Sequence, residues 1–294
     1  MGFDGRVAIV TGAGNGLGRE HALLLASRGA QVVVNDLGGS VAGDGGDAGP
    51  AQRIAEEIEA AGGVAVASTA SVSTRAGGED IVRTAVEAFG RVDIVVNNAG
   101  ILRDKAFHNL TDDLLDPVLD VHLRGAFYVT QPAWRLMRDQ GYGRVVNTSS
   151  AAGIFGNFGQ TNYGAAKMGV VGFTRVLAQE GAKYGVLANA IAPGAKTRMT
   201  EDILGGAADK LEPRLVSPIV GYLASEACSA TGRLFSVAGG RLAEIFIGVT
   251  RGIFDPDLSM EAIAERWDEM CDREGYLVPS NASEELGLLF SHIA

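Results

Sequence analysis

The sequence predicts an α/β protein built on a doubly wound parallel sheet of seven strands. Short apolar runs alternate with longer stretches of helical periodicity, which is typical of parallel strands joined by crossover helices. A glycine-rich turn follows the first apolar run directly and leads into a helix. Residues suited to chemistry follow the ends of several strands, where open parallel sheets bind their ligands. These features predict a Rossmann-type domain with a helical C-terminal extension.

The elements of this domain follow in order along the chain. The predicted strands are the apolar runs at residues 7–11, 31–35, 64–68, 93–97, 144–148, 187–192 and 234–237. The predicted helices run from about Leu17 to a stop at Gly29, then over residues 51–61, 79–89, 114–137, 165–184 and 213–225. We place residues 1–240 in the main domain. Residues 241–294, with helices at 260–271 and 283–292, are too few for their own core and are expected to pack on this domain or on a neighbouring subunit.

The composition excludes several classes of protein. A net charge of −10 over 294 residues disfavours a nucleic-acid or anionic-membrane partner, because either requires a basic face. No apolar run approaches the roughly 18 residues that span a bilayer. The two cysteines, Cys228 and Cys271, lie far apart without metal-ligand spacing, so we expect neither a disulfide framework nor a metal site. A cytoplasmic protein is the expectation.

The glycine-rich turn is the first candidate binding site. Glycines at 12, 14, 16 and 18 lie between a strand and a helix, where free backbone N–H groups and the helix dipole favour a phosphate. Asp36 ends the second strand, near the offset at which a carboxylate binds the adenosine ribose. That carboxylate would repel a 2′-phosphate and so favours NAD(H) over NADP(H). The alternatives are an ordinary turn and a solvated loop aspartate.

Three side chains suit alcohol–ketone interconversion. Tyr163 and Lys167 are four residues apart and share one helix face, and Ser150 lies on the preceding strand-to-loop segment. A free phenol has a pKa near ~10 and is a poor base, but a nearby cation favours the phenolate. A serine hydroxyl can hold the substrate oxygen while the tyrosine transfers its proton. Alternatively, Tyr163 packs in a core and Lys167 is a solvated charge.

Two loops carry further expectations. The glycine-rich loop at residues 38–50 is long for a strand-to-helix connection and is either a functional flap or a mobile segment. Residues 196–211 are polar and rich in small residues, which fits a lid. The basic residues Arg103, Lys105, Arg124 and Lys196 are candidates for a patch that binds the phosphates of a substrate, although isolated basic residues are usually solvated.

Taken together, these motifs resemble the short-chain dehydrogenase/reductase family. The resemblance covers residues 5 to about 240 and rests on TGAGNGLG at 11–18, NNAG at 97–100, Ser150, YxxxK at 163–167 and PG at 193–194. Longer strings, such as VVVNDLGG at 32–39 and SSAAGIFGNFGQTNYGAAK at 149–167, are similar to the (3R)-hydroxyacyl-CoA dehydrogenase unit of peroxisomal multifunctional enzymes of type 2. Here that unit is expected to stand alone, as in bacterial relatives.

The resemblance implies a role for each matching residue. Tyr163 is the general acid/base, Lys167 lowers its pKa and binds the nicotinamide ribose, and Ser150 holds the substrate oxygen. The remaining cofactor-binding residues are expected along the cofactor's length: Gly12, Asn15, Gly16, Leu17 and Gly18 at the pyrophosphate, Asp36 at the adenine ribose, Asn98, Ala99 and Gly100 between adenosine and nicotinamide, and Pro193, Gly194 and Thr197 at the nicotinamide end.

Two positions depart from the wider family. His122 stands where the family has an asparagine that supports a proton relay, as it does in the closer relatives, and either relays protons or only packs. Ala70 stands where the family has an aspartate that contacts adenine, so either adenine affinity is reduced or Ser71 supplies the contact.

The expected activity is NAD-dependent oxidation of a secondary alcohol, foremost the 3-hydroxyl of a (3R)-hydroxyacyl-CoA. The nearest alternative is a 17β-hydroxysteroid dehydrogenase or carbonyl reductase. A more remote alternative is a non-catalytic NAD(H)-binding sensor, which the presence of Ser150, Tyr163 and Lys167 disfavours. A homodimer or homotetramer is expected through the helices at 114–137 and 165–184.

Overall fold

The computed structural model describes residues 1–195 and 211–290. It divides into two compact units, Met1–Glu244 and Ile245–Ala294, so the division falls close to the predicted boundary at residue 240. Every helix of the described residues is too short or too polar to cross a bilayer. The predicted lid lies outside the described residues except for Leu211.

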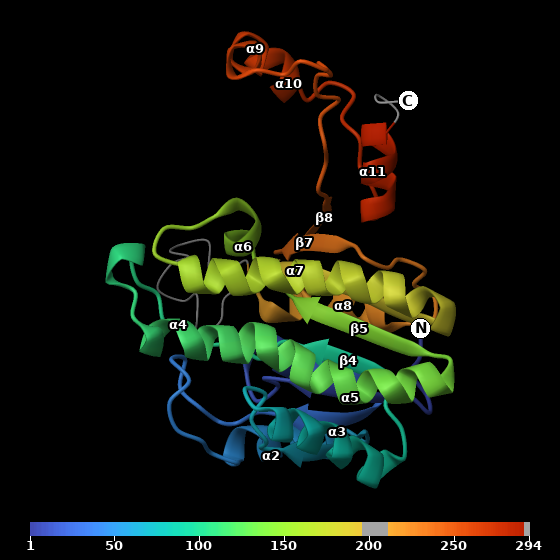
Figure 1. Ribbon diagram of the computed structural model, residues 1–294. Helices are drawn as coiled ribbons and strands as arrows, with labels where there is room; N and C mark the ends of the chain where they lie inside the picture. The colour runs from blue at the N-terminus through green and yellow to red at the C-terminus, as the bar shows by residue number, and fades with distance from the viewer. Residues whose placement is uncertain (196–210, 291–294) are drawn as a thin grey trace. The chain divides into compact units, whose positions relative to one another are not determined.

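The first unit is an eight-stranded sheet between two layers of helices (Figure 1). The strand order is β3-β2-β1-β4-β5-β6-β7-β8. The strands are β1 Val7–Thr11, β2 Gln31–Asn35, β3 Val64–Ser68, β4 Ile94–Asn97, β5 Gly143–Thr148, β6 Val186–Gly194, β7 Leu234–Ala238 and β8 Arg241–Ile245. β1 through β7 pair in parallel. All seven predicted strands are therefore confirmed.

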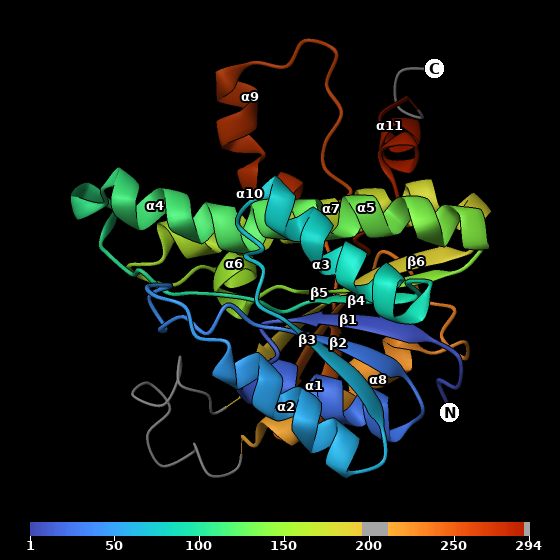
Figure 2. The same ribbon diagram turned by 90° about the horizontal axis from the view of Figure 1, so that it is seen from below.

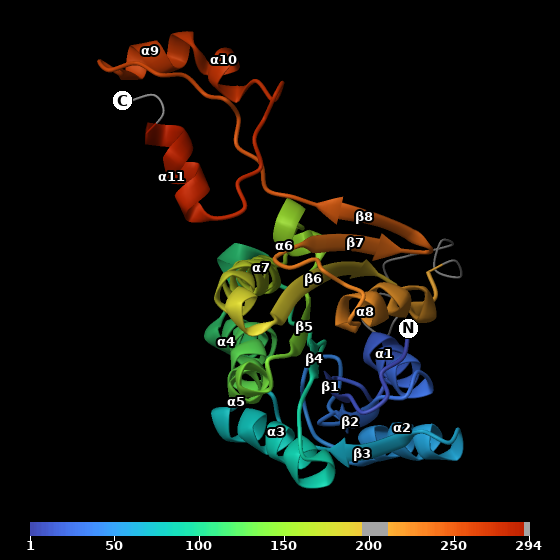
Figure 3. The same ribbon diagram turned by 90° about the vertical axis from the view of Figure 1, so that its right-hand side faces the viewer.

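The helices lie where the alternation predicts. They are α1 Gly16–Ser27, α2 Gly49–Ala60, α3 Arg75–Phe89, α4 Asp112–Leu119, α5 Gly125–Gln140, α6 Ala151–Phe155, α7 Thr161–Gly181 and α8 Ser217–Ala224, with single-turn helices η1 Phe107–Asn109, η3 Ala182–Tyr184 and η5 Pro213–Leu215. Figure 3 shows α3, α4, α5 and α7 on one face of the sheet and α1, α2 and α8 on the other.

Strand periodicity explains why both faces are covered. In β1, Val7 and Ile9 pack into the core beneath α3 and α5, whereas Ala8 and Val10 pack into the core beneath α1 and α2. All four side chains are fully buried. A strand that is apolar at every position needs a helix layer on each side.

The strand order reverses at β1, which lies between β2 and β4. From β1 the chain continues toward β2 and β3 on one side of the sheet, and from β4 it continues toward β5 on the other side. Because these connections diverge, they leave a crevice beyond the carboxyl ends of the strands. In Figure 2 the sheet is seen between the layers that hold α5 and α2, with β1, β4 and β5 near its middle. The topology therefore positions the candidate site.

The eighth strand is a feature that the sequence analysis did not predict. Gly239 and Gly240 join β7 to β8 with φ values of 53° and 85°. Two consecutive residues with positive φ form the tight turn of a hairpin, a conformation that glycine adopts without steric cost. The glycine pair therefore turns the chain back along β7, and β8 lies at the sheet edge.

The helical region predicted at 114–137 is longer than expected and interrupted. α4 and α5 are joined by η2, a π-helical segment over Asp120–Arg124. π turns widen a helix locally and occur frequently at functional sites. Here the segment includes the buried His122, which faces the candidate site.

The second unit has its own local structure but little burial. Its helices are α9 Met260–Glu265, α10 Trp267–Cys271 and α11 Ala282–Phe290, so the helix predicted at 260–271 is broken at Arg266. Val249 pairs with Leu277, and the rings of Phe246 and Tyr276 stack 5.4 Å apart. No residue of 245–290 is buried, which agrees with the expectation that the extension has no core of its own.

Candidate active site

A cleft of about 480 Å³ opens at the carboxyl ends of the central strands. Its wall includes the turn after β1, the end of β2, the segment after β4 and the start of α7. The predicted site residues that line it are Gly12, Asn15, Gly16, Leu17, Asp36, Ser71, Asn98, Ala99, Gly100, Tyr163, Lys167 and Pro193. Residues far apart in sequence are thus brought to a single site by the parallel sheet.

Three predicted residues lie beside this cleft, and one is not described. Gly18 is buried beneath the glycine-rich turn, Gly194 ends β6 next to Pro193, and Ser150 begins α6. Thr197 lies outside the described residues, so its predicted contact with the nicotinamide end stays a prediction.

The glycine-rich turn is braced by the segment after β4. Asn98 donates side-chain hydrogen bonds to the carbonyls of Thr11 and Gly12, at 3.0 and 3.1 Å. A Cβ on Gly12 would lie 2.7 Å from the Cα of Ala99, and one on Gly18 would lie 2.2 Å from the carbonyl oxygen of Gly12. Only glycine allows this close packing of turn, helix and neighbouring strand.

The start of α1 fits a bound phosphate. Asn15 precedes the helix, but its side chain makes no capping bond to the helix that follows. The first-turn N–H groups of a helix without such a cap need an external acceptor, and the helix dipole favours an anion there. Because Asn15, Gly16 and Leu17 line the cleft, this helix end fits the pyrophosphate of a dinucleotide.

Asp36 lies on the opposite side of the same turn. Its carboxylate accepts hydrogen bonds from the backbone N–H of Gly14 at 2.8 Å and of Gly38 at 2.7 Å. A Cβ on Gly14 would lie 2.8 Å from this carboxylate. Asp36 is thus held in place by backbone groups at the edge of the cleft, where the sequence analysis placed the adenine ribose.

Ser71 lies at the position where the expected adenine contact is in question. Its hydroxyl is 2.8 Å from that of Ser73, and both residues line the cleft. Ala70 uses its carbonyl to accept a 2.9 Å bond from the Asn35 side chain. The backbone of Ala70 thus braces the end of β2 through Asn35. In this part of the cleft lining, the polar side chains are those of Ser71 and Ser73.

Tyr163 and Ser150, which the sequence analysis expects to act on the substrate oxygen, are joined by a side-chain hydrogen bond. Ser150 is the N-cap of α6, and its oxygen accepts a bond from the N–H of Ala152. Burial raises the pKa of Tyr163, and this is the largest effect; a hydrogen bond with Ser150 lowers the pKa, and the charge of Asp104 raises it. The net direction is upward.

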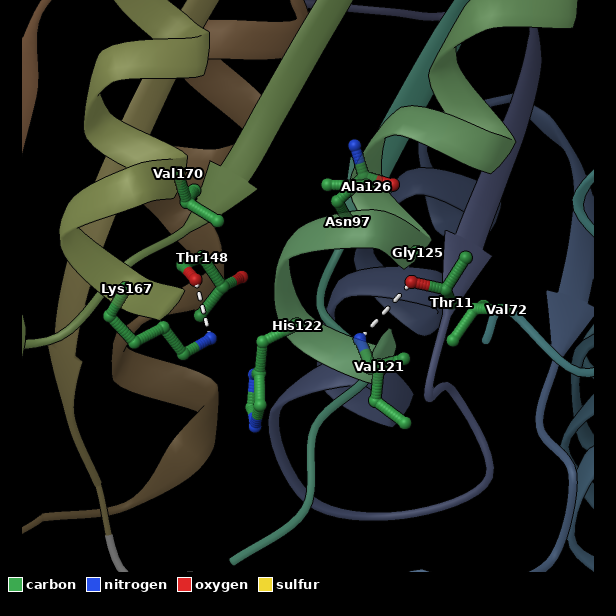
Figure 4. A pocket seen from close by; sticks show the side chains of 11 residues that line it. Thr11, Val72, Asn97, Val121, His122, Gly125, Ala126, Thr148, Lys167 and Val170 are labelled. Atoms are coloured by element: carbon green, nitrogen blue, oxygen red, sulfur yellow. Dashed lines mark hydrogen bonds between the residues drawn. The ribbon is translucent and has the colours of Figure 1, made fainter. Parts of the chain in front are cut away.

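Lys167 lies close to Tyr163 and is bonded to the end of β5. Its ammonium donates a 2.6 Å hydrogen bond to the carbonyl of Thr148 (Figure 4). The same ammonium lies 5.5 Å from the centre of the Tyr163 ring. Burial lowers the pKa of Lys167 to about 7. Burial therefore disfavours the charged form of the Lys167 side chain. The predicted lowering of the Tyr163 pKa by Lys167 stays a prediction.

His122 borders the cleft from the π segment. Its Nε2 lies 2.8 Å from the carbonyl oxygen and 3.1 Å from the nitrogen of Ile101. Its Nδ1 is buried without a partner among the described residues and faces a cavity of about 10 Å³, which Lys167 and Thr148 also line. In the view of Figure 4, Lys167 and Thr148 appear on one side of His122, and Thr11 and Val72 on the other. Burial and the charge of Lys167 hold the pKa of His122 well below 6.5.

The sequence analysis missed one wall of the cleft. Leu37, Gly39, Ser40, Val41 and Gly43 line it, so the loop left open between a flap and a mobile segment forms part of the site. Apolar and glycine residues in a long loop carry no periodic pattern, and only contacts with distant residues show where such a loop docks.

Two of the four basic residues that are candidates for binding substrate phosphates are engaged elsewhere. The guanidinium of Arg103 bonds to Ala42, Asp44 and Asp113, and that of Arg124 bonds to Asp120. Lys105 is exposed, and Lys196 lies outside the described residues.

Comparisons with known proteins agree with this geometry. Residues 6–206 match the family model described as short chain dehydrogenase. A Mycobacterium tuberculosis relative whose name places it among the short-chain type dehydrogenases/reductases is 49% identical over 93% of this chain and 96% of its own. Hydroxyacyl-CoA dehydrogenase ChsB1 of the same organism is 43% identical over 81% of this chain and 78% of its own.

A eukaryotic relative and a solved structure extend the comparison. Mouse peroxisomal multifunctional enzyme type 2 is 46% identical over 97% of this chain, which spans 39% of the mouse protein's length. The crystal structure of a short chain dehydrogenase from Mycobacterium avium is 42% identical, with a TM-score of 0.79 over 91% of this chain and 95% of that one. The resemblance inferred from the motifs is confirmed. The chain belongs to the short chain dehydrogenase family and is an oxidoreductase with a site for a nicotinamide dinucleotide.

Proposed function

We propose that the protein oxidises the 3-hydroxyl of a (3R)-hydroxyacyl-CoA to the 3-ketone with NAD⁺, and catalyses the reverse reduction with NADH. The observation that carries this proposal is that Tyr163 and Lys167 line one cleft of about 480 Å³ together with the glycine-rich turn, while Ser150 lies beside it at the N-cap of α6. The name of the mycobacterial relative ChsB1, a hydroxyacyl-CoA dehydrogenase, supports the choice of substrate.

Each of the three residues has a distinct task in this proposal. The Tyr163 oxygen takes the proton of the substrate hydroxyl, and the Ser150 hydroxyl donates a hydrogen bond to the same substrate oxygen as its carbon becomes trigonal. Lys167 lies one helical turn after Tyr163 and would hold the nicotinamide ribose. When bound, the oxidised nicotinamide accepts the hydride from the substrate carbon.

The raised pKa of Tyr163 has a consequence for direction. Burial disfavours the phenolate, so alcohol oxidation, which needs a proton acceptor, is expected to accelerate as the pH rises. Ketone reduction needs the protonated phenol and is expected to be favoured at lower pH. A general acid held protonated at neutral pH suits the reductive direction.

The choice of NAD(H) over NADP(H) rests on charge. Asp36 and Asp120 are the carboxylates among the described residues that line the cleft, and Lys167 is the one ammonium or guanidinium group among them. A 2′-phosphate would meet the Asp36 carboxylate with no arginine in that described lining to neutralise it.

The test is NADH formation, followed at ~340 nm, with paired (3R)- and (3S)-hydroxyacyl-CoA thioesters and a 17β-hydroxysteroid. Turnover of the (3R) thioester alone is expected. Tyr163→Phe should reduce turnover by about 10²–10⁴-fold, the usual contribution of a positioned acid or base, while NADH binding is retained. Tyr222→Phe, which alters a half-exposed tyrosine of α8, is the matched control.

The other outcomes separate the alternatives. Steroid turnover without thioester turnover would assign the protein to steroid oxidation. NADH binding without turnover of any of these substrates would favour a non-catalytic sensor.

We also propose a cytoplasmic homodimer or homotetramer that assembles through α5 and α7. Phe127 of α5 and Val176 of α7 are 47% and 56% exposed, and large apolar side chains at this exposure commonly mark an interface. Light scattering coupled to gel filtration would give the assembly's mass. A monomer at micromolar concentration would refute the assembly.

A further inference from the structure

Residues 38–48, which we call the glycine-rich segment, form one wall of the cleft and are held by internal hydrogen bonds. Within the segment, the Gly43 N–H donates to the carbonyl of Ser40, and the Ser40 N–H donates to the carbonyl of Asp44. Ser40, Val41 and Gly43 line the cleft. In Figure 1 the segment belongs to the blue loop at the lower left, between β2 and α2. The wall thus consists of backbone and small side chains with no apolar core of their own.

One side chain ties this wall to the rest of the domain. Arg103 donates from Nε to the carbonyl of Ala42 at 2.8 Å and from Nη2 to the carboxylate of Asp44 at 3.0 Å. Its Nη1 donates to the carbonyl of Asp113 at the start of α4, at 2.7 Å. The guanidinium therefore bridges the segment and a helix about 70 residues further along the chain. A planar guanidinium can make these three bonds at once, whereas an ammonium on a flexible stem cannot reproduce that fork.

The backbone of Arg103 is held from the other side. Asn162, which is 1% exposed, donates from Nδ2 to the carbonyls of Arg103 and Leu114, both at 2.9 Å. The oxygen of the same amide accepts the N–H of Tyr163 at 2.8 Å. Arg103 is thus fixed to the first turn of the helix that carries the catalytic tyrosine.

These contacts also distinguish Arg103 from a substrate-binding arginine. Its side chain is 19% exposed and its donors face carbonyls and one carboxylate. The backbone bond from Leu102 N–H to the carbonyl of Val41, at 3.0 Å, lies next to it and aligns the two strands of chain.

We propose that Arg103 is a positioning residue that holds the glycine-rich segment closed as a wall of the dinucleotide cleft, in register with the helix that carries Tyr163. This inference rests on the proposed use of NAD(H). Without the guanidinium, the segment loses both of its contacts with Arg103. It keeps the backbone bond from Leu102 to Val41 and, near its two ends, the bonds from Gly38 N–H to Asp36 and from Asp47 N–H to the carbonyl of Leu37. The cofactor must then order the segment on binding, which reduces its affinity.

The test compares Arg103→Ala, Arg103→Lys and the control Arg83→Ala. Arg83 lies on α3 with a side chain 60% exposed and pairs with Asp80 and Glu87, so it samples the loss of an arginine away from the cleft. Hydrogen–deuterium exchange of peptides covering residues 38–48 is measured first without cofactor. NADH affinity is then measured by fluorescence titration.

Arg103→Ala is expected to accelerate exchange in residues 38–48 but not in β1 or β4, and to raise the NADH dissociation constant about tenfold, which equals ~1.4 kcal/mol. NADH should restore protection of the segment in this variant. Arg103→Lys should be intermediate in both measurements, and Arg83→Ala should match the unaltered protein.

Three results would overturn the inference. The first is unchanged exchange in residues 38–48 of Arg103→Ala, and the second is accelerated exchange there with unchanged NADH affinity. The third, accelerated exchange throughout the domain, would show that Arg103 supports folding in general, and would also refute a local positioning role. Failure of the proposed function would be seen in the unaltered protein, which would then fail to bind NADH or to oxidise the thioester. That result does not depend on the rate of hydrogen–deuterium exchange in residues 38–48.

Discussion

The rings of His122 and Tyr163 meet edge to face, with their centroids 5.0 Å apart and their planes at 88°. His122 comes from the π segment between α4 and α5, and Tyr163 from the first turn of α7. The Nε2 of the histidine is occupied by the peptide groups of Ile101, either donating to the carbonyl or accepting from the N–H according to the tautomer. His122 therefore braces Tyr163 against the segment after β4.

The first prediction concerns this brace. His122→Phe preserves an aromatic ring beside Tyr163 but leaves the peptide groups of Ile101 unpaired in a buried place. We expect a loss of about 1–3 kcal/mol in the free energy of unfolding, the usual cost of a buried polar group without its partner. Urea denaturation at pH 7 measures it, with His108→Phe at an exposed position as the control.

This cost should depend on pH in a defined way. The pKa of His122 is lowered in the folded chain. As the pH falls below 6.5, His122 therefore becomes protonated in the unfolded chain while it stays neutral in the folded chain. The unaltered protein loses that contribution to stability on acidification, and His122→Phe does not. The difference between the two should shrink below pH 6; a constant difference from pH 5 to 8 would contradict a buried neutral histidine.

The second prediction concerns Lys167. Its pKa falls from 10.5 to about 7 on folding, so the folded chain binds fewer protons than the unfolded chain between these values. The unaltered protein should therefore gain stability relative to Lys167→Met as the pH rises from 7 toward 10, by a few kcal/mol at most. Urea denaturation between pH 6.5 and 9.5 gives the trend.

The exposed Lys183 provides the matched control for this trend. Lys183→Met removes an ammonium that is not buried, so the trend of Lys167→Met is read as its difference from this variant over the same range. A flat difference between the two variants would mean that Lys167 remains fully charged in the folded protein.

The third prediction concerns cofactor choice. Asp36→Asn keeps the size of the side chain and one acceptor for the N–H groups of Gly14 and Gly38, but removes the charge. Removing the repulsion should raise the affinity for NADPH relative to NADH by about tenfold, equivalent to ~1.4 kcal/mol. Fluorescence titration with both cofactors measures the ratio.

Asp47→Asn is the control for the cofactor ratio, since Asp47 is exposed and does not line the cleft. If Asp36→Asn leaves the ratio of NADPH to NADH affinity unchanged, another group discriminates between the cofactors.

The fourth prediction tests the packing of the glycine-rich turn. In Gly18→Ala the new methyl group would lie 2.2 Å from the carbonyl oxygen of Gly12, so the turn must move and we expect a loss of about 1–3 kcal/mol in stability. Gly287→Ala, on an exposed face of α11 with no atom within 4 Å, should instead stabilise the protein by about 0.5–1 kcal/mol. Opposite signs in thermal denaturation would confirm the assignment; a neutral Gly18→Ala would show that the turn has room.

Local patterns accounted for most of the fold. Every predicted parallel strand is present, and β2 and β3 have the predicted bounds. Turn residues were harder to interpret. A pair such as Gly239-Gly240 can end a strand, or it can form a hairpin turn that leads into another strand. Here it forms a hairpin turn, and β8 follows it. The helix predicted at 213–225 is shorter, since η5 and α8 are separated at Val216.

For this protein the sequence by itself determined three features: the order of strands and helices along the chain, the glycine-rich turn, and the shared helix face of Tyr163 and Lys167. Each of these depends on residues that are close together in the chain. Only the tertiary structure decided that Lys167 bonds to the carbonyl of Thr148, that burial raises the pKa of Tyr163, and that Arg103 anchors the segment after β2. Burial and hydrogen-bond partners come from segments tens of residues apart, and no local pattern records which of them the fold will bring together.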